Sequence, residues 1–119
     1  MEATDLMIGD WVYRPDCYCK VKEVRENGII GRDHLRGIIS FEELKPIPLT
    51  PEILKKNGFD NYGGIFKFEE EGIDIQIRLD KYVRVFAGMD NTCNFKSGFY
   101  VHKLQHALRM CGINKEIVL

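Results

Sequence analysis

The stretch FEELKPIPLTPEILKKNGF, residues 41–59, decides the organisation of this chain. Pro46 and Pro48 keep its first part extended, because a proline fixes its own φ and disfavours helix in the residue before it. The stretch therefore separates a β-rich first part from a different second part. We expect two subdomains packed as one unit, the first at residues 1–49 and the second at residues 50–119.

A short helix is predicted directly after the two prolines. Thr50 is a good N-cap, and Pro51 suits the first helical position because its missing N–H would have no partner there. Gly58 can end the helix, since glycine readily adopts the left-handed conformation found past a helix C-terminus. Ile53 and Leu54 are expected to supply the apolar contact of this helix.

The residues before the connector favour short β-strands. Trp11-Val12-Tyr13 follows a Gly-Asp turn signal, and Asn27-Gly28 is a strong hairpin signal. Four short strands are predicted, at residues 6–13, 20–24, 29–32 and 38–41. Short strands joined by turns at this spacing are typical of small barrels, which leave few open sheet edges. We therefore expect an SH3-like small β-barrel.

The residues after the connector predict an antiparallel meander and a helix, which makes the fold class α+β. Strands are predicted at residues 66–68, 73–79 and 82–87, with a turn at 69–72 and a polar loop at 88–98. The longest helix is predicted at residues 99–111. Its apolar side chains recur at a 3-4-3 spacing and form one core-facing stripe of Val101, Leu104, Leu108 and Cys111.

Composition excludes several broad classes of function. The chain has 119 residues and a formal charge of −1, so nucleic acid is disfavoured as a partner because there is no basic excess for its backbone. No apolar run approaches the roughly 18 residues of a membrane span, and the opening MEATD is acidic where a secretory leader is basic. We expect a cytoplasmic protein whose four cysteines stay reduced.

The best binding candidates are aromatic and basic residues of the first half. Aromatic faces can stack on a base, and guanidinium groups bind phosphate bidentately, so this mixture suits a nucleotide, an oligonucleotide or an acidic peptide. The alternative interpretation is a barrel core followed by a solvated loop. The candidates are Trp11, Tyr13, Tyr18, Arg32, His34 and Arg36.

The predicted C-terminal helix offers a second candidate surface. His102, His106 and Arg109 fall opposite the apolar stripe, so we expect them to face solvent or a protein partner. Two histidines four residues apart can grip a metal ion, but no third ligand is identifiable. We therefore predict no metal and no cofactor. The lone Cys17-x-Cys19 pair is a weak metal signal, and the acids at 69–71 are typical of a solvated turn.

Three segments carry a resemblance to a known family. The opening IGDWV at 8–12, the connector KPIPLTPEILKKNGF at 45–59 and the closing YVHKLQHAL at 100–108 resemble those of a large uncharacterised family. That family is found in gut Bacteroidales, their phages and their mobile elements. The resemblance implies a phage or mobile-element setting in a bacterial cell and implies no activity. The chain departs from the family pattern at CYC (17–19), at RDHLRG (32–37) and in a shortened central meander.

These observations predict a non-enzymatic accessory binding protein with an unknown ligand. No nucleophile elbow, P-loop or dinucleotide fingerprint is present in the sequence, so we do not expect an enzyme. Two alternatives remain open. One is a sponge that sequesters a nucleotide immune signal, which makes the protein an anti-defence candidate. The other is a protein-interaction adaptor that uses the exposed face of the C-terminal helix.

Overall fold

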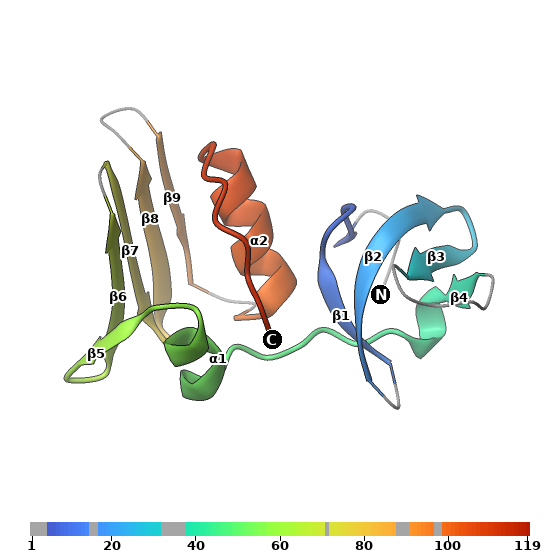
Figure 1. The fold of residues 1–119 in the computed structure, drawn as a ribbon, viewed down its shortest axis with the longest axis horizontal. Coiled ribbons are helices and arrows are strands. Elements are labelled where there is room, and N and C mark those ends of the chain that lie inside the picture. Colours follow the sequence, from blue (N-terminus) through green and yellow to red (C-terminus); the bar gives the residue numbers. More distant parts are fainter. Residues whose placement is uncertain (1–4, 15–16, 32–37, 71, 88–90, 97–98) are drawn as a thin grey trace. The chain divides into compact units, whose positions relative to one another are not determined.

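The computed structural model describes residues 5–14, 17–31, 38–70, 72–87, 91–96 and 99–119. It confirms the α+β class, with a curled four-stranded antiparallel sheet, a second antiparallel sheet of five strands and a C-terminal helix (Figure 1). The chain divides into two compact units, which are called unit 1 (Met1–Ile47) and unit 2 (Pro48–Leu119) below. Each unit is built around its own sheet.

Unit 1 curls into half a barrel with the strand order β1-β2-β3-β4 (Figure 1). Its strands are β1 (Trp11–Arg14), β2 (Cys17–Arg25), β3 (Gly28–Gly31) and β4 (Ile39–Ser40), and a short 3-10 helix, η2, follows at Phe41–Glu43. Strands therefore form at all four predicted places. The buried core consists of Leu6, Val12, Cys19, Val21, Ile29, Ile39 and Leu44.

The β2–β3 hairpin explains two irregular features of the sequence. Apolar and polar residues alternate imperfectly in β2 because the strand carries a register shift between Val21 and Glu23. Such a bulge moves the following side chains to the other face. Gly28 is required at the start of β3, because a Cβ there would lie 2.1 Å from the backbone oxygen of Ile39 on β4.

Asp10 is a buried polar residue directly before β1. Its Oδ2 accepts the N–H of Met7 at 2.8 Å, and its backbone oxygen accepts the N–H of Val21 at 2.8 Å. The first hydrogen bond closes the N-terminal turn, and the second ties this turn to β2. A carboxylate is tolerated at this buried position because it accepts a backbone hydrogen bond there.

Unit 2 begins with the predicted helix, α1 (Pro51–Lys56). Thr50 caps it, since its Oγ1 accepts the N–H of Ile53 at 3.3 Å. Asn57 is the C-cap, and Gly58 follows in the left-handed region with φ of 87°. The predicted start and end of this helix are confirmed.

The sheet of unit 2 is a five-stranded meander in the order β5-β6-β7-β8-β9. The strands are β5 (Asp60–Tyr62), β6 (Ile65–Glu70), β7 (Ile73–Arg78), β8 (Tyr82–Ala87) and β9 (Asn91–Phe95). The three predicted strands form its centre. Their inner face carries the buried side chains of Phe66, Ile75, Ile77, Val83 and Val85.

Both edge strands differ from the sequence-based prediction. Residues 91–95 were expected in a polar loop, but they form β9. This strand pairs antiparallel with β8, so that Asn91 lies opposite Ala87 and Phe95 lies opposite Val83. β5 was not predicted, and it pairs with β6 at the other edge. Edge strands form by pairing along one side only, so they need no apolar alternation of their own.

The C-terminal helix, α2 (Val101–Met110), packs against the sheet of unit 2 (Figure 1). The predicted apolar stripe is confirmed, because its four residues are all at most 5% exposed. The helix begins two residues later than predicted, with Tyr100 as its N-cap. After Gly112, a tail at 113–119 carries two more buried side chains, Ile113 and Ile117.

Candidate functional site

Four side chains of the β1–β2 hairpin occupy the face of the sheet opposite buried Val12. They are called the aromatic strip and comprise Trp11, Tyr13, Tyr18 and Lys20. Antiparallel pairing places Trp11 beside Lys20 and Tyr13 beside Tyr18. The two tyrosine rings meet edge to face at 6.0 Å, and the ammonium of Lys20 lies 5.7 Å from the Trp11 ring centroid. Tyr13 is 38% exposed and Tyr18 is 50% exposed.

The aromatic strip can bind a flat ring beside an anion. Its tyrosine faces are accessible for stacking, and Lys20 supplies an ammonium on the same face. The strip brings together the three aromatic residues predicted from the sequence and adds Lys20, which the prediction did not include. The predicted basic partners lie outside the described residues; they are Arg32, His34 and Arg36.

The polar side of α2 is more buried than the sequence predicted. His102 was expected to be exposed, and this is wrong, because its exposed fraction is 2%. Its ring stacks on Tyr100 at 6.0 Å and meets His106 edge to face at 5.6 Å. Gln105 is 6% exposed, and Arg109 is half-buried. The helix is therefore covered on more than its apolar stripe, and the predicted partner face is not an open surface.

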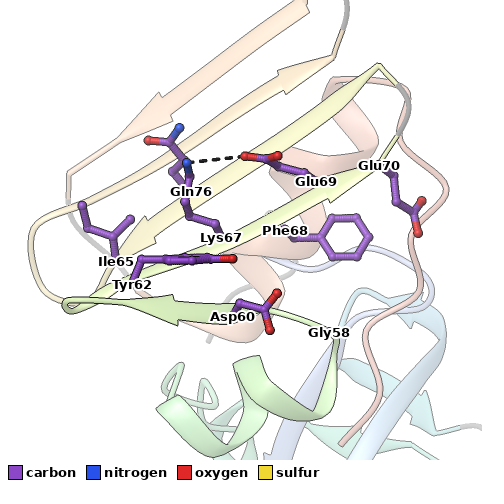
Figure 2. A pocket seen from close by; sticks show the side chains of 9 residues that line it. All are labelled: Gly58, Asp60, Tyr62, Ile65, Lys67, Phe68, Glu69, Glu70 and Gln76. Atoms are coloured by element: carbon purple, nitrogen blue, oxygen red, sulfur yellow. Dashed lines mark ion pairs between the residues drawn. The ribbon is translucent and has the colours of Figure 1, made fainter.

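A hollow of about 530 Å³ lies at the β5 edge of the sheet of unit 2 (Figure 2). It exists because β5 begins at Asp60, opposite Lys67, whereas β6 continues as far as Glu70. We call it the acidic hollow. Its lining residues are Gly58, Asp60, Tyr62, Ile65, Lys67, Phe68, Glu69, Glu70 and Gln76.

One cation and one exposed aromatic ring lie within the acidic hollow. The ammonium of Lys67 lies 3.4 Å from a carboxylate oxygen of Glu69 and 6.0 Å from the ring centroid of Tyr62. Tyr62 is 61% exposed, so most of its ring faces solvent. Figure 2 shows these three side chains on neighbouring strands, with the ion pair dashed.

A second, shallower hollow of about 390 Å³ shares two walls with the first. Glu69 and Glu70 line both. The sequence interpretation placed these two acids in a turn, but both belong to β6. The register sets Asp74 of β7 directly opposite Glu69, so two carboxylates face each other across the strands. The remaining lining residues of the second hollow are Gly72, Ile73, Asp74 and Phe86.

Asp74 is only partly satisfied by its neighbours. Its Oδ2 accepts a hydrogen bond from Nε2 of Gln76 at 3.3 Å. Its Oδ1 is buried and accepts no hydrogen bond from any residue that the structure describes. A buried carboxylate oxygen that accepts no hydrogen bond carries a desolvation cost.

Lys115 of the tail lies close to Phe68 and Glu70 of β6. Its ammonium is 3.9 Å from the ring centroid of Phe68, which also packs on Phe59 at 5.6 Å. Burial lowers the pKa of Lys115 below its ordinary value of 10.5, and the nearby Glu70 carboxylate partly opposes this. The ammonium is therefore already engaged on an aromatic face.

Within the described ranges, no three His, Cys, Asp or Glu side chains are arranged to hold a metal ion. None of the helices in those ranges has the length and apolar character needed to cross a bilayer. Comparison with known proteins found no matching family model, no matching curated protein and no matching solved structure.

Proposed function

We propose that this chain is a non-enzymatic binding protein whose ligand site is the aromatic strip of unit 1. The proposal includes the finer fold assignment, in which the curled sheet of unit 1 is an SH3-like small barrel. One observation carries the site: Tyr13 and Tyr18 stand side by side with exposed rings on the outer face of a two-stranded hairpin. Contiguous exposed aromatic surface is a feature of ligand-binding and partner-binding sites.

The ligand class that fits best is a nucleotide. A base would stack on the tyrosine rings, and a phosphate would pair with Lys20 and with Arg32 or Arg36, the phosphate-binding candidates from the sequence. A protein that only lowers the concentration of free nucleotide needs tight binding and no turnover. This is the sponge function, and its phage or mobile-element setting follows from the resemblance of the three segments described above.

An adaptor function through α2 is the second candidate from the sequence. Burial of His102 leaves His106 and Arg109 partly accessible, beside the exposed side chains of Lys103 and Met110. The remaining surface is small for a protein interface, which ordinarily involves about 20–30 residues on each partner. We therefore rank nucleotide binding above the adaptor.

A thermal-shift and calorimetry panel of cyclic oligonucleotides and ADP-ribose derivatives tests the proposal. A bound nucleotide should raise the melting temperature, and the intact nucleotide should be recovered after heating the complex. Tyr18→Ala should weaken binding about tenfold or more, since a base–aromatic stack contributes about 1–3 kcal/mol, and Arg36→Ala should also weaken it. Tyr18→Phe should bind like the parent.

Tyr62→Ala is the matched control, because it removes an exposed tyrosine from unit 2. It should leave nucleotide affinity unchanged. If no nucleotide in the panel shifts the melt, or if Tyr62→Ala weakens binding as much as Tyr18→Ala, the aromatic strip is not the site. A host protein that co-purifies and is lost when His106 and Arg109 are substituted would favour the adaptor instead.

A further inference from the structure

Lys45 extends the aromatic strip beyond the β1–β2 hairpin. It lies directly opposite Tyr13 in an isolated antiparallel bridge. The two residues exchange both backbone hydrogen bonds, because the Tyr13 N–H donates to the Lys45 oxygen at 2.8 Å and the Lys45 N–H donates to the Tyr13 oxygen at 2.9 Å. Side chains of directly opposed residues point to the same face of a sheet. Lys45 is exposed, so its side chain stands on the face that carries the tyrosine rings.

The same bridge brings the two tyrosine rings close together. Because the N–H and the oxygen of Tyr13 both bond to Lys45, Tyr13 and Tyr18 form a non-hydrogen-bonded pair. The Cα atoms of such a pair are only about 4.5 Å apart, against about 5.5 Å in a hydrogen-bonded pair. This agrees with the edge-to-face contact of the two rings at 6.0 Å. The row across the sheet is therefore Lys45, Tyr13 and Tyr18.

Two lysines flank Tyr13 from opposite sides. Lys45 is its neighbour on one side, and Lys20 lies on β2 on the other side, two residues along from Tyr18. Two strand spacings across the sheet and two residues along the strand separate the Cα atoms of the two lysines by about 12 Å. A ring stacked on Tyr13 is therefore within reach of an ammonium group at each end.

The strands of this face carry a local excess of positive charge. Glu23 is the acid among the described residues of β1 and β2, and it forms an ion pair with Arg25 at 3.1 Å. Asp16, in the turn between the strands, lies outside the described residues, and Glu42 and Glu43 lie on η2. A chain with a formal charge of −1 thus gathers cations beside its exposed rings, which suits an anionic ligand. The basic residues of the two strands are Arg14, Lys20, Lys22 and Arg25.

We propose that the aromatic strip and Lys45 bind a nucleoside that carries a phosphate on each side, as in a 3′,5′-linked oligonucleotide. This inference rests on the proposed nucleotide function and narrows its ligand. The base stacks on the tyrosine rings, one phosphate pairs with Lys20 and the other pairs with Lys45. A nucleotide whose phosphates all lie on one side of the nucleoside reaches only one of the two lysines. The site therefore favours cyclic and linear oligonucleotides over ADP-ribose derivatives, whose phosphates all lie on the 5′ side of adenosine.

Two ligands with the same base and the same number of phosphates test this inference. Adenosine 3′,5′-bisphosphate has one phosphate on each side of the nucleoside, whereas ADP has both on one side. Both are titrated into the whole chain by calorimetry at about 0.1 M salt, where exposed charges are only partly screened. The bisphosphate should bind about fivefold more tightly than ADP, which is the upper range for one additional exposed ion pair.

Lysine variants connect this preference to the two sides of the site. Lys45→Met and Lys20→Met should each weaken bisphosphate binding about fivefold and change ADP binding by at most about twofold, because ADP keeps one lysine in either variant. Lys45→Arg should retain the preference, since a guanidinium also binds phosphate. Lys55→Met is the matched control, at an exposed lysine on α1 of unit 2, and should change neither affinity. The ratio of the two affinities is independent of stability, because both ligands bind the same folded population.

The outcomes separate failure of this inference from failure of the proposed function. If ADP and the bisphosphate bind equally and Tyr18→Ala weakens both, the aromatic strip binds nucleotides and the two-sided arrangement is wrong. If Lys45→Met weakens both ligands alike, Lys45 attracts anions in general and the arrangement is again wrong. If no nucleotide binds, the proposed function and this inference are both wrong, and binding of an acidic peptide instead would assign the lysines to a protein partner.

Discussion

Asn57→Ala tests a side-chain clamp that holds the C-terminal tail of unit 2. Asn57 is 6% exposed, although it is a polar residue at the end of a short helix. Its Nδ2 donates to the backbone oxygens of Ile53 and Val118, both at 2.8 Å, and its Oδ1 accepts the N–H of Val118 at 2.8 Å. The side chain therefore satisfies both backbone groups of Val118 and ties the tail to α1.

The expected cost of Asn57→Ala follows from these three hydrogen bonds. At about 1 kcal/mol net for each, the loss is about 3 kcal/mol in the free energy of unfolding. Leaving the Val118 groups fully desolvated would cost more, but the Val118 side chain is 46% exposed and water can reach the frayed tail. Asn57→Asp should be at least as harmful at neutral pH, because a carboxylate cannot donate to the two oxygens.

Denaturant unfolding and amide hydrogen exchange measure the effect. The Val118 amide should lose its protection in Asn57→Ala, because its only acceptor in the described structure is Oδ1 of Asn57. Asn114→Ala is the matched control, since Asn114 is an exposed asparagine on the same tail, and it should change stability by at most about 0.5 kcal/mol. Equal stabilities of Asn57→Ala and Asn114→Ala would refute the clamp.

Two further predictions concern the core and the tail. Leu104→Ala and Leu108→Ala should each destabilise by about 2–5 kcal/mol in denaturant unfolding, whereas Met110→Ala, at a side chain 79% exposed, should change little; similar losses for all three would contradict the assigned helix face. The pKa of Lys115 is lowered in the folded state, so between that pKa and 10.5 the unfolded state binds more protons than the folded state does. The stability of the parent protein relative to Lys115→Met should therefore rise with pH across this window. A difference between these two proteins that stays constant with pH would contradict this.

Local sequence signals predicted both α-helices and the three central strands of the second sheet. Thr50 and Pro51 fixed the start of α1, because an N-cap hydroxyl and a missing N–H act on the first turn alone. The stripe through Leu104 and Leu108 predicted which face of α2 meets the sheet, since helical spacing is itself local. These features require no knowledge of distant residues.

Features that depend on distant partners were missed. Asn57 lies 61 residues from Val118, so nothing near Asn57 in the sequence indicates the clamp. His102 is opposite the apolar stripe, and its burial depends on what covers that side of α2. β9 forms through pairing with β8, although its own residues are mostly polar. In each case tertiary contacts outweighed the local pattern.

Of the two candidate sites, the residues of the aromatic strip were identified from the sequence and the acidic hollow was not. Trp11, Tyr13 and Tyr18 were identified from residue type, and strand pairing placed them on one face together with Lys20. The acidic hollow was not foreseen, because the acids at 69–71 were interpreted as a turn. One signal was available: Asp74 and Gln76 alternate with buried isoleucines, so they must share the outer face of β7.

The opposition of Glu69 and Asp74 is a consequence of the core on the other face of the sheet. The same register pairs Phe66 with Ile77 on the inner face. A slip by one residue would separate the two carboxylates, but it would also turn the buried isoleucines of β7 outward. Like charges directly opposite each other cost about 0.2–1 kcal/mol, whereas burying one isoleucine contributes about 1.5–3 kcal/mol. The core therefore fixes the register, and the two opposed carboxylates on the outer face follow from it.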